Sequence, residues 1–186
     1  MSDGLNELGK NLEDKFFLER DQELLAKLRE QSLVEDSREA LSRAIGISDE
    51  SVIAELTKHD ISVENLTALS IVPLVEVAWA DKQMEASEVD AIMKACDQSG
   101  IKDGDPAYWL VKSWLGNQPS SELFDAWDEY VKSLASALEA TAFAQLKTSV
   151  LNRTREVAKS AGGFLGLGAV SAAEQKVTAR IETVFG

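Results

Sequence analysis

The chain has few of the residues on which catalytic, disulfide-linked and metal-binding proteins depend. Its 186 residues include one cysteine, one histidine and three prolines. Because Cys96 is alone, an intrachain disulfide and a multi-cysteine metal site are both excluded. A nucleophile pair of Cys96 and His59 would need a third group to orient the imidazole, whereas a histidine near the end of a helix is ordinary. We therefore expect a protein that binds rather than an enzyme.

Nucleotide motifs and long apolar runs are missing as well. The glycine-rich segment 162–168 lacks the Lys-Ser/Thr pair that a phosphate-binding loop requires. No window is long enough to span a bilayer, and the N-terminus lacks the basic start and apolar stretch of a signal peptide. From these features we expect no integral membrane segment and a cytoplasmic location.

Charge of positive sign is scarce. The sequence has 32 acidic and 19 basic residues, for a formal net charge of −13. Such a surface repels phosphate backbones and anionic lipids, so we expect no nucleic acid among the partners. It favours cations and basic partners, although an acidic surface can also serve solubility alone.

Helix-forming residues dominate what is present. Leu, Ala, Glu and Lys recur throughout, while β-branched residues are scattered, and this composition predicts an all-α fold, a multi-helix bundle. Apolar residues follow a helical stripe from residue 5 to residue 28 and predict an N-terminal arm that ends near Gln31. We expect an N-terminal helical region over residues 1–60 and a helical domain over residues 61–186.

Capping residues predict where the helices begin and end. Asp36 and Glu39 form a capping box that opens a helix ending near Gly46, and Pro73 predicts a kink or a restart at Ser70. The other predicted starts are Ser48, Ser62, Glu85, Asp105 followed by Pro106, Ser120 or Ser121, a long pattern over 137–159, and Ser171 with Glu174.

Residues 73–88, Pro73-Leu-Val-Glu-Val-Ala-Trp-Ala-Asp-Lys-Gln-Met-Glu-Ala-Ser-Glu88, carry the most informative pattern. An apolar helix ends in Ala-x-x-Asp, and an acidic residue opens the next helix. Segments 155–161 and 170–174 repeat parts of this pattern weakly. The pattern resembles that of TerB-like proteins, named after the tellurite-resistance protein TerB, over about residues 66–185.

The resemblance implies two pseudo-repeated helical units, a stress-associated context in bacteria, and divalent-cation binding through acidic residues. Lys82 departs from the family pattern, which has glycine at that position. The departure puts the tight loop, and any cation site that relies on it, in doubt. Residues 12–60 resemble, faintly, the zeta-type helical inhibitor of bacterial ATP synthase in Leu12-Glu-Asp-Lys-Phe-Phe and in Asp21-Gln-Glu-Leu.

Four carboxylates are the candidate metal ligands. Asp81, Glu85 and Glu88 could gather a weakly bound calcium or magnesium ion, but a complete EF-hand loop is excluded because Trp79 and Val77 occupy ligand positions. Acidic residues at a helix start also have a simpler role, since the helix dipole stabilises them. Glu76, the fourth candidate, lies in an apolar run and either faces solvent or is partly buried with a partner.

Six aromatic residues lie within residues 105–131. Their helical spacing indicates a core between two adjacent helices, and tryptophan and tyrosine are also the preferred anchors of binding surfaces. Three functions follow as expectations. The first is a non-catalytic TerB-like interaction module with an unknown protein partner, the second a metal-dependent enzyme or metal-binding protein that uses the glutamates, and the third a regulator of ATP synthase.

Overall fold

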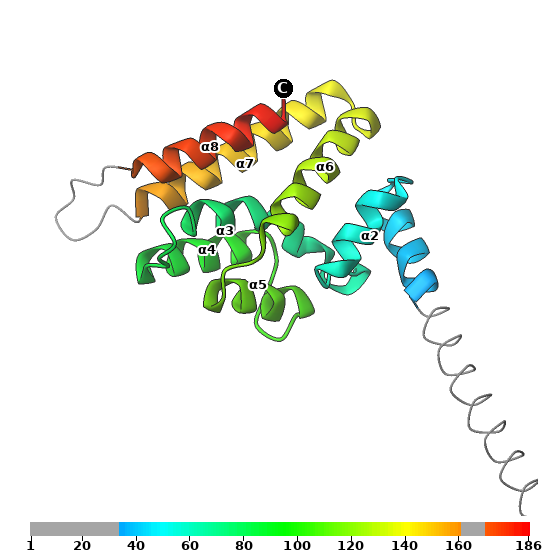
Figure 1. The fold of residues 1–186 in the computed structure, drawn as a ribbon, viewed down its shortest axis with the longest axis horizontal. Coiled ribbons are helices and arrows are strands. Elements are labelled where there is room, and N and C mark those ends of the chain that lie inside the picture. The colour runs from blue at the N-terminus through cyan, green and yellow to red at the C-terminus, as the bar shows by residue number, and fades with distance from the viewer. Residues whose placement is uncertain (1–33, 161–169) are drawn as a thin grey trace, which may run out of the picture. The chain divides into compact units, whose positions relative to one another are not determined.

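A computed structural model describes residues 34–160 and 170–186, and within those ranges every regular element is a helix (Figure 1). This confirms the all-α prediction for the described part of the chain. The chain divides into two units, Met1–Ala40 and Leu41–Gly186. The predicted arm over residues 5–31 lies outside the described residues. None of the described helices is both long enough and apolar enough to cross a bilayer.

After a helical segment over residues 34–45, eight helices follow in the described ranges. They are α2 (Glu50–Lys58), the 3-10 helix η1 (Val63–Ser70), α3 (Val72–Ala78), α4 (Ala86–Gln98), α5 (Pro106–Gly116), α6 (Ser121–Ala137), α7 (Ala140–Ser160) and α8 (Ala172–Val184).

Most predicted starts are confirmed, because the predicted residues occupy the N-cap positions, and at Ser171 the side chain also accepts a hydrogen bond from the Glu174 N–H. The N-caps of η1, α5, α6 and α8 are Ser62, Asp105, Ser120 and Ser171. The predicted start at Asp36 is wrong, since the chain is already helical at residue 34.

Two further boundaries are clear from the local chemistry. The predicted start at Ser48 is one residue early, because it is the carboxylate of Asp49 that accepts hydrogen bonds from the N–H groups of Ser51 and Val52, at 2.9 and 3.3 Å. Of the predicted kink or restart at Ser70, the restart is the one observed, one residue later: η1 ends at Ser70, Ile71 is the N-cap of α3, and Pro73 lies in the first turn.

Helix α3 is the centre of the core. Its residues Val72, Leu74, Val75 and Val77 are completely buried. Helices α4, α6, α7 and α8 pack against α3, while α5 packs on η1 and α2 packs on α6. In Figure 1, α7 and α8 lie side by side above α3 and α4.

The aromatic residues divide between core and surface. Trp114, Phe124 and Trp127 are buried in the core, and the indole N–H of Trp127 donates to the Leu69 carbonyl at 3.0 Å. Trp109, by contrast, is 60% exposed. The predicted core role is therefore confirmed for the three buried side chains, and Trp109 faces solvent.

Candidate functional site

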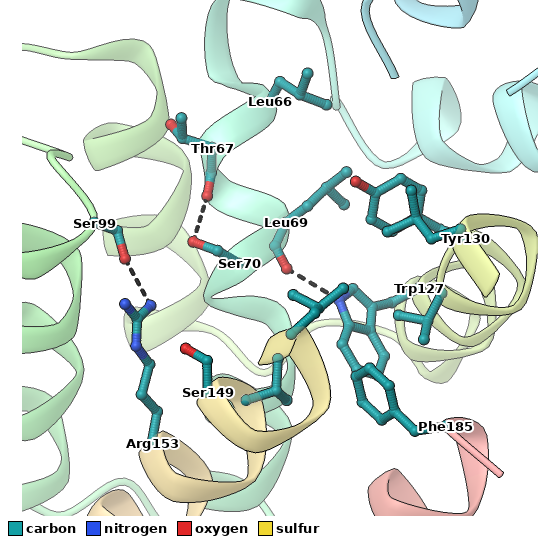
Figure 2. A pocket seen from close by; sticks show the side chains of 14 residues that line it. Leu66, Thr67, Leu69, Ser70, Ser99, Trp127, Tyr130, Ser149, Arg153 and Phe185 are labelled. Atoms are coloured by element: carbon teal, nitrogen blue, oxygen red, sulfur yellow. Dashed lines mark hydrogen bonds between the residues drawn. The ribbon is translucent and has the colours of Figure 1, made fainter. Parts of the chain in front are cut away.

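A groove of about 400 Å³ opens between η1, α6 and α7 (Figure 2). A pocket of that size with mainly apolar walls and a few polar groups is typical of binding sites. Its walls are Leu66, Thr67, Leu69 and Ser70 of η1, Trp127, Tyr130, Val131 and Leu134 of α6, Leu146, Ser149, Val150 and Arg153 of α7, and Ser99 and Phe185 at the ends of α4 and α8. We call this the apolar groove.

The walls from α6 and α7 follow one rule of spacing. Residues 127, 130, 131 and 134 of α6, and residues 146, 149, 150 and 153 of α7, each fall at positions i, i+3, i+4 and i+7. Residues so spaced share one face of a helix over two turns. Each helix therefore presents a two-turn stripe to the groove, in which Trp127, Val131 and Val150 also belong to the buried core.

Packing and a hydrogen bond fix the aromatic end of the groove in place. Besides its hydrogen bond to the Leu69 carbonyl, Trp127 packs edge-on against Phe185 with ring centroids 6.1 Å apart. Phe143 also packs against Phe185, with ring centroids 5.5 Å apart. Burial raises the pKa of the neighbouring Tyr130 hydroxyl above its usual value. This end of the groove is therefore walled by apolar side chains that are held in place and nearly buried.

The opposite end is polar and positively charged. Arg153 is half-buried there, and its Nη1 donates to the Ser99 hydroxyl at 2.8 Å (Figure 2). Among the described residues no carboxylate forms an ion pair with Arg153, and Arg153 is the only charged side chain that lines the groove. The exposed side chains of Ser70 and Ser149 complete this end.

The predicted metal ligands are placed differently from one another. Glu88 is 2% exposed and closes a capping box at the start of α4, where its Oε2 accepts from the Glu85 N–H at 2.8 Å. Burial is the largest cause that raises the pKa of the Glu88 carboxyl to about 7, and the carboxylates of Glu174, Asp81 and Glu85 also raise it. Glu88 is therefore a buried helix cap in an acidic neighbourhood.

Asp81 lies in the turn that precedes this cap. Its Oδ1 accepts from the Gln83 N–H at 2.9 Å, which closes the turn. The next residue, Lys82, has a φ angle of 67°, in the left-handed region that favours glycine. The lysine thus adopts the backbone conformation for which glycine would be the ordinary choice.

Glu174 repeats the arrangement of Glu88 at the start of α8. Its Oε2 accepts from the Ser171 N–H at 2.6 Å, while its Oε1 is buried without a hydrogen-bond partner among the described residues. Even so, in the described ranges no group of three or more His, Cys, Asp and Glu side chains is arranged to hold a metal ion. The calcium or magnesium site at Asp81, Glu85, Glu88 and Glu76 stays a prediction.

Glu76 belongs to a separate cluster. Its carboxylate and that of Asp128 both pair with the guanidinium of Arg180, so that one arginine on α8 joins α3 and α6. Burial raises the pKa of both carboxyls, and Arg180 opposes that rise. Of the two alternatives for Glu76, the partly buried carboxylate with a partner is the one observed.

The sequence alone predicts neither the place of Arg153 in the groove nor the pairing of Arg180 with Glu76 and Asp128. The sequence places Arg153 near Glu156, which is exposed in the structure, and nothing in it singles out Arg180. A signal for Arg153 is present, because the stripe at residues 146–153 mixes Leu, Val, Ser and Arg on one helical face. No local signal marks Arg180, since its partners are 52 and 104 residues away.

No family profile, curated protein or solved structure matches this chain.

Proposed function

We propose that this chain is a non-catalytic interaction module that binds a partner protein in the apolar groove. The observation that carries the proposal is the groove itself, with two helical stripes, a packed aromatic end and an arginine that has no ion pair among the described residues. Aromatic side chains and arginine are the residues most often responsible for binding energy at protein interfaces. If the stripe on α7 served only to pack the core, its fourth position would be expected to hold an apolar residue. That position holds Arg153, which indicates a role in binding.

The wider setting of the module is part of the same proposal. A TerB-like ancestry with a stress-associated role in bacteria rests on the pattern in residues 73–88. The left-handed backbone at Lys82 supports it, because that is where the family pattern has glycine. The cation-responsive part of the proposal is supported by the buried Oε1 of Glu174, which has no hydrogen-bond partner in the described ranges, and by the effect of Glu174 on Glu88.

The test of the module is recovery of partners from the cells that make it. Ser149→Trp fills the groove from an exposed position on α7 and leaves the core untouched. Thr148→Trp, on the same helix but outside the groove, is the matched control. Tagged wild-type and variant chains are purified from their own cells, and the proteins that accompany them are quantified by mass spectrometry.

We expect at least one protein that accompanies the wild type and Thr148→Trp and is lost from Ser149→Trp. Melting curves establish that both variants are folded. Equal recovery of every accompanying protein by all three chains, or no accompanying protein at all, would refute the proposed role of the groove.

A further inference from the structure

Building on the proposed function, we propose that the groove takes an amphipathic helix of the partner, with an Asp or Glu about two turns from its apolar anchor that pairs with Arg153. The helical form follows from the walls. Both α6 and α7 present stripes at i, i+3, i+4 and i+7, and two such faces receive a third helix by packing ridges into grooves. An amphipathic helix laid in an apolar groove is a recurring mode of recognition.

Charge complementarity identifies the acidic residue. Arg153 is the only charged side chain in the lining, and among the described residues its one polar contact is with the Ser99 hydroxyl. An arginine presents five N–H donors in a planar fork, so most of its donors remain available to a ligand. A carboxylate matches that fork in geometry as well as in charge.

Because the rest of the surface is acidic, Arg153 selects for a partner helix with an acidic residue at this position. The chain carries a formal net charge of −13, so an acidic helix is repelled from most of the molecule and attracted at Arg153. A basic helix would be attracted to the surface in general but repelled at this end of the groove. The arginine therefore determines both the sign of the partner's charged residue and the direction in which the helix lies.

The spacing of the wall predicts the spacing of the ligand. On α7, Leu146 lies three residues from Phe143, which packs on Phe185 at the aromatic end, and Arg153 forms the polar end seven residues after Leu146. At a rise of 1.5 Å per residue this separation is about 10 Å. A helix that lies along α7 covers the same distance in seven residues, so its acidic residue should be about seven positions from its apolar anchor.

A selection from a random peptide library tests the inference while the partner is still unidentified. Sixteen-residue peptides displayed on phage are selected on the wild-type chain, and those that also bind Ser149→Trp are removed. The retained peptides are measured against wild type, Arg153→Gln and Arg153→Lys. Arg155→Gln is the matched control, because Arg155 is two residues away on α7 and outside the groove, with only an exposed pairing to Glu182 at 3.8 Å among the described residues.

We expect the retained peptides to share apolar residues and an Asp or Glu about seven positions from one of them. Their affinity should fall about tenfold on Arg153→Gln, the scale of one hydrogen bond to a charged group. It should be partly restored by Arg153→Lys and be unchanged by Arg155→Gln. Replacing the peptide's acid by its amide should weaken binding to the wild type and not to Arg153→Gln.

Each other result has a distinct meaning. Groove-dependent peptides that lack an acid, or that ignore Arg153→Gln, would overturn the inference and leave the proposed function intact. Failure to retain any groove-dependent peptide would overturn the inference and count against the proposed function too. Wild-type self-association in sedimentation experiments that Ser149→Trp abolishes would show that a second copy of the chain covers the groove, which also overturns the inference.

Discussion

Two regions that both include helix α6 each contain an arginine, and they differ in whether that arginine is paired with carboxylates. At the first, Arg180 is paired with Glu76 and Asp128, and the three side chains tie α8, α3 and α6 together. At the second, Arg153 lies at the end of the apolar groove with a serine hydroxyl and no carboxylate among the described residues. The first arrangement satisfies its charges within the fold, whereas the second leaves one for a partner.

The comparison shows how to separate a structural arginine from one that serves recognition. A charge removed from water is stable only when it is paired, so a paired arginine between helices supports the fold. An arginine beside an apolar groove, half exposed and without an acid, contributes little to folding but is well placed to bind.

The largest effect is expected from Arg180→Met. It leaves two mostly buried carboxylates, Glu76 and Asp128, without a cation, and we expect a loss of about 2–3 kcal/mol in the free energy of unfolding. Urea denaturation measures it. Without the arginine both pKa values rise further above their unfolded values, so the loss should be greater at pH 8 than at pH 5. A loss below about 0.5 kcal/mol would mean that the cluster does not support the fold.

Glu88 sharpens the comparison because it is buried like Glu76 but forms no ion pair with an arginine of the described ranges. Its folded pKa of about 7 exceeds its usual value of 4.5, so the folded state binds the extra proton between these values and stability falls as pH rises through that window. Glu88→Gln keeps the oxygen that accepts from the Glu85 N–H and removes the buried charge. We expect a gain of about 2 kcal/mol, or about 5 °C in melting temperature, at pH 8 and almost none at pH 4.5. An equal change at both pH values would contradict the raised pKa.

The carboxylates at the start of α4 could also be neutralised by a bound cation, rather than by an arginine or a proton. If Asp81, Glu85 and Glu88 hold one, calcium at several times its dissociation constant should raise the melting temperature by about 3 °C, corresponding to about 1 kcal/mol. Asp81→Asn should abolish that response. Sodium chloride at matched ionic strength controls for screening of the acidic surface. Equal stabilisation by both salts would remove the site and leave only an acidic helix start.

The smallest effect on stability is expected from Arg153→Gln. Its one hydrogen bond among the described residues, to Ser99, lies in a half-buried position, so the change in the free energy of unfolding should stay within about 0.5 kcal/mol. The same urea denaturation used for Arg180→Met gives the value. A loss comparable to that of Arg180→Met would show that Arg153 supports the fold, and the contrast between the two regions would disappear.

Local chemistry explains which parts of the fold could be predicted. Most helix starts depend on residues that are close together in sequence, such as Ser171 with Glu174 or Pro73 after Ser70. The composition and the capping residues were therefore sufficient to predict the all-α class and most helix starts. The predicted helix start at Asp36 was wrong because the same capping pattern also occurs inside helices, where it does not mark a start.

The candidate site depends on residues far apart in the chain, which spacing does not bring together. The groove combines residue 66 with residue 185, and the indole of Trp127 meets a carbonyl 58 residues away. Lys82 is an intermediate case. The resemblance marks its position as one for glycine, but only the structure shows that lysine adopts the left-handed backbone there.

The central claim, that the apolar groove is the binding surface, is tested most directly by amide hydrogen exchange on the chain with and without the partner recovered from cells. The account predicts slower exchange on binding in residues 66–70, 127–134 and 146–153, with Ser149→Trp showing no such change. Slowed exchange confined to other segments, for example around the exposed Trp109 of α5, would contradict it.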